Sequence, residues 1–140
     1  EDCQPIVQSH DVFVARGMKI PHRWLFPQCK VALVHGGAGT VHTALAAGCP
    51  VLVVPCEASS DQPFWAEVVT QRGVGRAAGV MGDKLKPGCS GRLSAMLREM
   101  VDDPGLKARV EALAEAMRAE TGLADAGVIV MDLAGKKSSA

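Results

Sequence analysis

The sequence predicts an α/β domain built on a parallel sheet, and three observations support this. Two short apolar runs, residues 31–34 and 51–54, are typical of strands buried on both faces of a parallel sheet. A glycine-rich turn at residues 35–39 follows the first run. Helical patterns separate the strands, which implies right-handed crossovers between parallel neighbours. Since only three or four strands are visible, we expect the first strands of the sheet to precede Glu1.

The N-terminal part carries weaker patterns. Residues 1–10 are polar, show no periodicity and are taken as an N-terminal segment. Residues 11–15 are rich in β-branched and aromatic side chains, which predicts a short strand. Glycine and proline mark residues 16–21 as a loop. We expect residues 22–27 to form one helical turn with its aromatic side chains turned inward.

The middle of the chain alternates between strand and helix. Residues 40–47 predict a helix, and Gly48 lies where its left-handed C-terminal residue would be. The strand 51–54 follows, and Pro55 ends it. A polar loop then leads to a helix over residues 62–72. One side of that helix would carry Phe64, Val68 and Val69.

The C-terminal part predicts a short strand and three helices. The strand covers residues 74–78, and a helix over 90–101 would bury Leu93, Leu97 and Val101. Asp103 and Pro104 then supply a cap and a first helical position. Apolar residues recur along this second helix at Leu106, Val110, Leu113 and Met117. We expect Gly122 to end it, a last helix over 123–133, and a frayed tail at 136–140.

Composition excludes several classes of protein. The 140 residues suit one domain, and the 15 basic side chains balance 15 acidic ones, which argues against a general nucleic-acid surface. The five cysteines form no CxxC pair, so we expect free thiols in a reducing compartment. No apolar run approaches the ~18–20 residues that a membrane-spanning helix needs. The chain begins without Met, and we expect a fragment or a processed piece.

The glycine turn is the strongest functional signal. Its glycines, Gly36, Gly37 and Gly39, match neither GxGxxG nor a Walker A loop. Glycines between a strand and a helix let the backbone approach an anion, and N–H groups at the helix N-terminus point toward it. His35, at the end of the strand, can donate a hydrogen bond to a phosphate oxygen. The residues alone leave a plain tight turn as the alternative. His42 is interpreted as structural.

Asp61 and Gln62 form a second candidate feature. They follow the strand 51–54 across a loop, so they also lie at the carboxyl edge of the sheet. Carboxylate and amide groups suit the hydroxyls of a sugar, because they accept and donate hydrogen bonds. The alternative is an Asp61 cap at the start of a helix. Both can hold at once, since a cap residue can also face a ligand.

Taken together, these segments resemble the nucleotide-sugar-binding half of family 1 UDP-glycosyltransferases, and most closely their sterol 3β-glucosyltransferase branch. That branch carries the series PHDWLFP, HHGGAGT, DQPFW and GVG in this order. The matching segments of this chain are residues 22–27, 34–40, 47–55, 61–65 and 72–75. The resemblance covers about residues 11–133. Val34 replaces the first histidine of the second motif, and the sugar loop before Asp61 is longer than is usual.

The resemblance implies the GT-B fold, in which two Rossmann-like domains face each other across a cleft. Residues 11–135 would be part of the C-terminal, UDP-sugar-binding domain. The implied reaction transfers glucose from UDP-glucose to a sterol or other lipid hydroxyl, with inversion and without metal or other cofactor. No catalytic residue is assigned here, because the general base would belong to an N-terminal domain that this chain lacks. We therefore expect the chain alone to be almost inactive.

The resemblance also implies residue roles. The diphosphate would be held by His35, Gly36, Gly37, Ala38, Gly39 and Thr40. Asp61 and Gln62 would bind the sugar, and the loop with Gly17, Met18 and Ile20 would meet the uracil. Trp24 and Phe26 would pack beneath that loop, and Trp65 behind the sugar loop.

Partners and location follow from the same resemblance. The expected partners are a UDP-sugar and, through the absent domain, a sterol or lipid acceptor, with no nucleic acid. We expect a cytoplasmic protein whose full-length form can touch a membrane peripherally. Two alternatives stay open: a transferase for another small-molecule acceptor, and a non-catalytic nucleotide-sugar-binding module.

Overall fold

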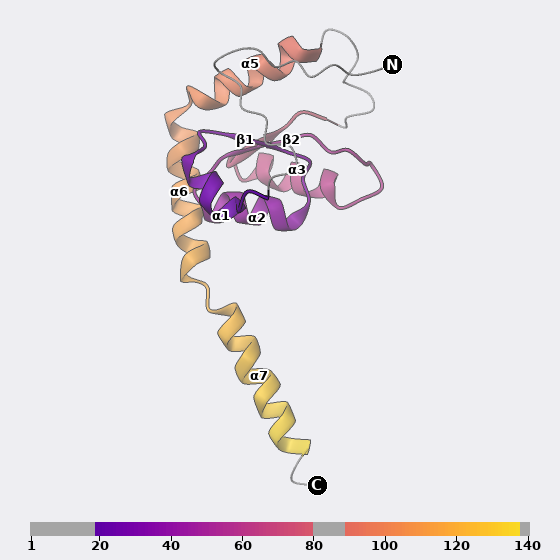
Figure 1. The fold of residues 1–140 in the computed structure, drawn as a ribbon, viewed down its shortest axis with the longest axis vertical. Coiled ribbons are helices and arrows are strands. Elements are labelled where there is room, and N and C mark those ends of the chain that lie inside the picture. Colours follow the sequence, from indigo (N-terminus) through magenta and orange to yellow (C-terminus); the bar gives the residue numbers. More distant parts are fainter. Residues whose placement is uncertain (1–18, 80–88, 138–140) are drawn as a thin grey trace.

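The computed structural model of this chain describes residues 19–79 and 89–137 (Figure 1). The expected strand at 11–15, together with Gly17 and Met18, lies outside the described residues. The first half contains α1 (His22–Leu25), η1 (Phe26–Gln28), β1 (Ala32–Val34), α2 (Ala38–Ala46), β2 (Val51–Val53), α3 (Gln62–Gln71) and β3 (Gly75–Ala77). The second half contains α5 (Cys89–Val101), α6 (Pro104–Ala119) and α7 (Gly122–Lys137).

The described strands form one parallel sheet in the order β1-β2-β3. Ala32 pairs with Val51, and Val51 pairs with Gly75, so the three strands start level with one another. Helices α2 and α3 make the crossovers, and the carboxyl ends of all three strands therefore lie at one edge. The predicted parallel α/β arrangement is confirmed.

The core centres on β2, whose residues Val51–Val53 are buried completely, as the unbroken apolar run predicts. Val41 from α2, Val69 from α3 and Val110 from α6 are buried to the same extent. Gly75 lies so close to β2 that a Cβ there would collide with the carbonyl oxygen of Val51. The lack of a side chain at this position therefore lets β3 pair closely with β2 and lets α3 pack against the sheet.

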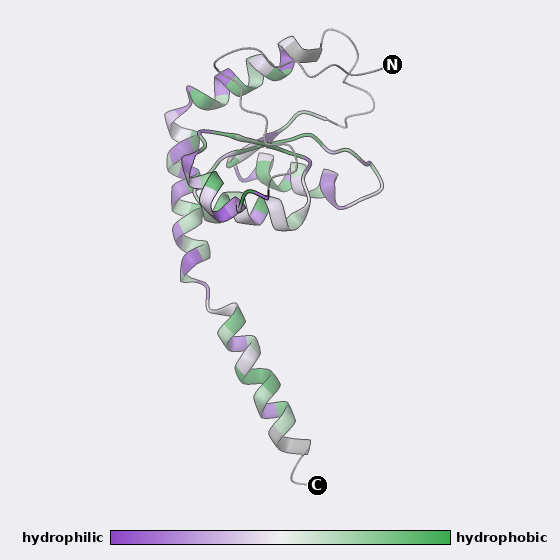
Figure 2. Ribbon diagram, viewed as in Figure 1, coloured by the Kyte–Doolittle hydropathy of each residue, from purple (hydrophilic) through white to green (hydrophobic). Residues whose placement is uncertain are grey.

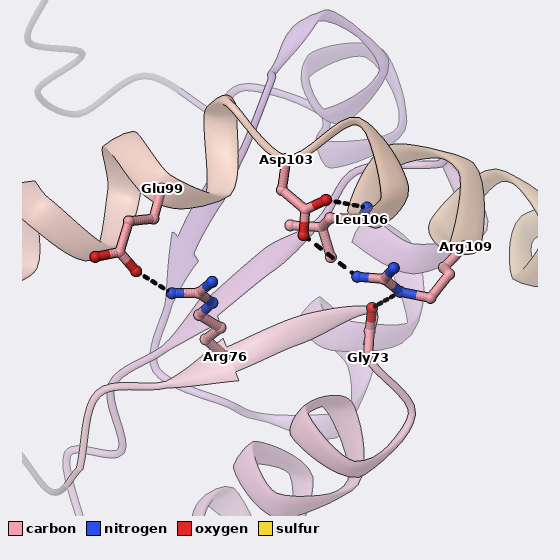
Figure 3. A network of polar contacts seen from close by, with 6 residues as sticks. All are labelled: Gly73, Arg76, Glu99, Asp103, Leu106 and Arg109. Carbon is pink, nitrogen blue, oxygen red and sulfur yellow. Dashed lines mark hydrogen bonds and ion pairs between the residues drawn. The ribbon is translucent and has the colours of Figure 1, made fainter.

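Basic side chains of α6 fasten that helix to the turns that end α2 and α3. Lys107 donates to the carbonyl oxygen of Gly48 at 2.9 Å, and Arg109 donates to that of Gly73 at 2.7 Å. Carbonyl groups at helix C-termini lack helical partners, so these cations satisfy them. Figure 3 shows the Arg109 contact beside the ion pair between Arg76 of β3 and Glu99 of α5.

Several predicted faces are wrong in detail. Phe26 is buried, with 5% of its surface exposed, but Trp24 is 62% exposed and does not pack inward. Residues two apart on a helix lie roughly 200° apart, so only one of them can face the core. The same geometry leaves Phe64 exposed, because α3 buries Ala66 and Val69.

In α5 the buried side follows Leu93, Leu97 and Met100, and Val101 is exposed. A strict spacing of four drifts by roughly 40° at each step, which carries Val101 off this face.

Helix boundaries also differ. Helix α2 begins at Ala38 rather than Thr40, because Gly37 is already the N-cap residue. Helix α6 ends at Ala119, where Glu120 turns to an extended conformation, and Gly122 begins α7 instead of ending α6. Helix α7 continues to Lys137, so the expected tail at 136–140 is partly helical.

Helix α7 extends away from the sheet (Figure 1), although apolar residues run along it (Figure 2). Its side chains from Gly122 to Ala134 are exposed, and Leu123 is 92% exposed. Among the described residues, no helix is long and apolar enough to cross a membrane.

Candidate functional site

The turn between β1 and α2 depends on Gly36. Its φ of +98° is a conformation that residues with a side chain rarely adopt. A Cβ on Gly36 would lie 2.6 Å from Cγ1 of Val53 and 3.0 Å from the backbone oxygen of Gln62. Both the backbone angle and the available space therefore require glycine. The same distances show that the predicted diphosphate turn lies close beside the predicted sugar-binding residue Gln62.

The N-terminus of α2 is open to an anion. Gly37 is the N-cap and makes no side-chain capping bond, and the first turn contains no acidic residue. The first intrahelical bonds run from Thr40 and Val41 to the carbonyl oxygen of Gly37. The N–H groups of Ala38 and Gly39 precede them and have no carbonyl partner within the helix. These two donors and the positive end of the helix dipole favour a negatively charged ligand.

The side chain of His35 lies over the same turn. A Cβ on Gly37 would come within 2.6 Å of Nε2 of His35, so Gly37 leaves the space that the imidazole occupies. His35 itself is exposed. An imidazole N–H and the backbone N–H groups of Ala38 and Gly39 thus gather at one end of α2, as an oxyanion ligand requires.

The sugar loop is held by Gln62. Its side-chain oxygen accepts hydrogen bonds from the backbone N–H groups of Cys56 at 2.7 Å and Glu57 at 3.4 Å. These bonds fold residues 56–61 against the start of α3. The side-chain oxygen of Gln62 is therefore already hydrogen-bonded within the protein, which leaves the side-chain NH₂ group as the part best suited to a ligand.

Asp61 does not act as the cap that the sequence allowed. It occupies the N-cap position of α3, but its side chain makes no capping hydrogen bond. Instead, Oδ2 of Asp61 accepts a hydrogen bond from the indole Nε1 of Trp65 at 3.1 Å. The Ser60 hydroxyl accepts from the backbone N–H of Gln62 at 3.3 Å. The Asp61 carboxylate is exposed and has accepting capacity left for a ligand.

Sequence reasoning missed this role of Trp65, although the spacing of four between Asp61 and Trp65 on one helix signals that the two side chains can meet. The ring of Trp65 also contacts the ring of His42, with centroids 4.7 Å apart and an interplanar angle of 89°. His42 therefore packs against Trp65, in keeping with its interpretation as a structural residue.

The structure brings the two predicted halves of the site together, while the uracil loop can be followed only in part. Among its predicted residues, Ile20 is described and half-buried, and Gly17 and Met18 lie outside the described residues. In residues 19–79 and 89–137, no group of three His, Cys, Asp or Glu side chains could hold a metal ion. The ligand-binding roles of all these residues stay predictions.

Cys29 and Cys49 are free thiols. Burial in the core raises the pKa of the Cys49 thiol to about 11; nearby Cys29 adds to the shift, and Lys107 opposes it. A thiol with such a pKa stays protonated at neutral pH and serves as a packing residue. Cys29 is half-buried and Cys56 is exposed.

Comparison with known proteins shows similarity to glycosyltransferases. A family model described as "Erythromycin biosynthesis protein CIII-like, C-terminal domain" matches residues 12–131. Sterol 3-beta-glucosyltransferase UGT80A2 of Arabidopsis thaliana is 43% identical over 107 residues, which cover 76% of this chain and 16% of that protein. O-mycaminosyltylonolide 6-deoxyallosyltransferase of Streptomyces fradiae is 33% identical over 124 residues, which cover 85% of this chain and 27% of that protein.

Solved structures show the same relationship. The glycosyltransferase VinC in complex with DTDP matches with a TM-score of 0.63 and 31% identity, over 72% of this chain and 24% of that chain. The chain thus spans only about a sixth to about a quarter of the length of these three proteins.

Proposed function

Because this chain belongs to the EryCIII-like C-terminal domain family of glycosyltransferases, we propose that it binds UDP-glucose within an inverting glucosyltransferase that acts on a sterol or other lipid hydroxyl. The chain has the fold of the C-terminal, donor-binding half of a GT-B glycosyltransferase, so the predicted fold class is confirmed. The identities of the nucleotide, the sugar and the acceptor are what we propose.

One observation carries the proposal: the close approach of Gly36 to Gln62 places the predicted diphosphate turn beside a loop that carries a carboxylate and an amide. A nucleoside diphosphate sugar presents a diphosphate and a hydroxylated ring at adjoining positions. The N–H groups of α2 and the His35 imidazole suit the first, and Asp61 and Gln62 suit the second.

The same arrangement explains how the site would assist the reaction. The acceptor oxygen forms a bond to the anomeric carbon while the bond from that carbon to the diphosphate breaks, and negative charge grows on the departing diphosphate. Fixed donors at Ala38, Gly39 and His35 would stabilise that charge in the transition state. Contacts from Asp61 would hold the sugar in line for attack.

The proton of the acceptor hydroxyl needs a general base, which we place outside this chain. We propose that the donor site works without metal, since α2 and His35 supply the positive field, and that residues 1–140 alone transfer almost no glucose. The similarity to UGT80A2 supports the sterol acceptor. The same proposal includes a cytoplasmic location with peripheral membrane contact in the full-length protein, because a sterol is presented by a membrane.

The test is calorimetric titration of the 140-residue chain with UDP and with UDP-glucose. Cooperative thermal unfolding first establishes that the chain is folded. We expect both to bind, UDP-glucose more tightly, and neither affinity to change on addition of a chelator. A folded chain that binds no UDP would overturn the proposal.

A second candidate has specific support. The Streptomyces fradiae relative is named as a 6-deoxyallosyltransferase, and VinC was solved with DTDP. The chain could therefore serve a transferase that uses a thymidine-linked deoxysugar and a natural-product acceptor. Titration with DTDP beside UDP separates the two, because tighter binding of DTDP would favour this second candidate.

A further inference from the structure

We infer that Trp65 is a positioning residue for the donor sugar: its indole holds the Asp61 carboxylate in the orientation that meets the sugar hydroxyls. This inference rests on the proposed function, because it deepens the role of the same site. It adds a residue that would not touch the ligand and would act through Asp61.

The hydrogen bond between the two side chains is the first support. Nε1 of Trp65 donates to Oδ2 of Asp61 at 3.1 Å across one turn of α3. Asp61 makes no capping bond, so within the described part of the chain the indole is the group that restrains its carboxylate. Oδ1 remains available to accept from a hydroxyl.

The second support is the setting of the indole. Trp65 is half-buried and packs against the hydrophobic core, so its ring cannot swing freely as an exposed side chain can. The ring of His42 meets the indole edge-on, with the two ring centroids 4.7 Å apart. An immobile donor fixes the acceptor that it binds.

His42 links Trp65 to a second helix. It belongs to α2, whose N-terminus faces the predicted diphosphate position. The contacts from His42 to Trp65 and from Trp65 to Asp61 therefore connect the diphosphate helix to the sugar carboxylate. A sugar attached to the diphosphate needs that fixed relation, because a freely rotating carboxylate would lose entropy on binding it.

The experiment is a double-mutant cycle on the 140-residue chain, with calorimetric dissociation constants for UDP and UDP-glucose. The variants are Trp65→Phe, which removes the indole N–H and keeps an aromatic ring, Asp61→Ala, and both together. We expect Trp65→Phe to weaken UDP-glucose by about threefold to tenfold and to leave UDP unchanged, as loss of one hydrogen bond in the site predicts. In the Asp61→Ala background, Trp65→Phe should have no further effect.

Phe64→Leu is the matched control. Phe64 neighbours Trp65 and contacts its ring, but it offers no hydrogen-bond donor to Asp61. We expect its replacement to leave both dissociation constants unchanged.

A measurement on the unmodified chain complements the variants. The chain contains two tryptophans, so its nitrogen–proton NMR spectrum has two indole signals, and Trp24 provides the reference. The Trp65 signal should move further with UDP-glucose than with UDP. Equal movement with both ligands would count against the inference.

The outcomes separate the inference from the proposed function. Equal losses for UDP and UDP-glucose in Trp65→Phe would make Trp65 a purely structural residue and overturn the inference. A Trp65→Phe effect that persists in full without Asp61 would do the same. If the wild-type chain prefers UDP-glucose no more than Asp61→Ala does, the sugar role of Asp61 fails, and the inference fails with it.

Discussion

The two loops at the carboxyl edge of the sheet are built in different ways. The turn from β1 to α2 is shaped by its backbone: Gly36 has a positive φ, and Gly37 leaves space for an imidazole. The loop from β2 to α3 is shaped by side chains, because Gln62 binds the N–H groups of Cys56 and Glu57. Trp65 binds Asp61 beyond it.

This difference suits the two parts of the proposed ligand. Backbone N–H groups offer the same donors to any diphosphate, so the first turn can contribute affinity without selecting a sugar. Side chains that accept and donate at set positions can distinguish one arrangement of hydroxyls from another. We therefore expect changes in the first turn to affect all nucleotide ligands, and changes in the second loop to affect only those with a sugar.

Gly36→Ala should have the largest effect. The positive φ and the overlap with Val53 and Gln62 should together cost roughly 2–4 kcal/mol of unfolding free energy. Because the turn must shift, binding of UDP and UDP-glucose should both be lost. Chemical denaturation and calorimetry measure the two effects.

Gly127→Ala is the matched control. Gly127 lies within α7, and a Cβ there would have no atom within 4 Å. Alanine is the better helix former, so stability should stay equal or rise slightly. If the two glycine variants unfolded alike, the turn would not depend on Gly36 as described.

His35→Ala should follow in size. It removes one donor to the diphosphate and leaves the backbone donors of Ala38 and Gly39 in place. We expect UDP to bind about tenfold more weakly, the effect of one hydrogen bond to a charged group. Uridine, which lacks the phosphates, serves as the control ligand. A loss of uridine binding as large as that of UDP would remove His35 from the diphosphate role.

Asp61→Ala should show the opposite selectivity and a smaller effect. UDP-glucose should bind about threefold to tenfold more weakly, while UDP should change little, because the exposed carboxylate would meet only the sugar. Calorimetry with both ligands decides this. A parallel loss of UDP would mean that Asp61 supports the anion turn rather than the sugar.

The contrast also explains how far the sequence could lead. Apolar runs and glycines encode local geometry, so residues 31–34, 51–54 and the turn at 35–39 predicted the parallel strands and the crossover between them. The close approach of Gly36 to Gln62 is not predictable from the sequence, because it depends on how closely two neighbouring turns pack. The sequence predicts a packing role for Trp65; the spacing of four permits its hydrogen bond to Asp61, but the bond itself depends on the rotamer of each side chain.

Helix faces show the same limit. The spacing of Leu106 and Val110 predicted the buried side of α6 correctly. In α3, however, the sequence predicts Phe64 on the same side as Val69, whereas the helix buries Ala66 with Val69 and leaves Phe64 exposed. Which of several apolar residues a helix buries depends on the surface opposite it, which the helix sequence does not contain.

Asp103→Asn should have the smallest effect and sharpens the comparison, because Asp103 is an aspartate that does cap its helix. Its Oδ1 accepts from the backbone N–H of Leu106 at 3.0 Å. That bond lowers the pKa of Asp103, although desolvation opposes the shift. The backbone N–H of Gly105 and the charge of Arg109 lower the pKa further. A lowered pKa stabilises the folded chain above the ordinary aspartate pKa of about 3.9, and this contribution is lost as the pH falls through the folded-state value.

Asparagine keeps an accepting oxygen but not the charge, so this variant should unfold at a slightly lower temperature at pH 7 and lose the difference from wild type in acid. UDP binding should be unchanged, because α6 begins away from the glycine turn. Thermal unfolding between pH 7 and pH 2.5 measures the first effect, and calorimetry measures the second. A pH-independent difference would show that the charge of Asp103 contributes nothing, and that this cap works only through the geometry of its accepting oxygen.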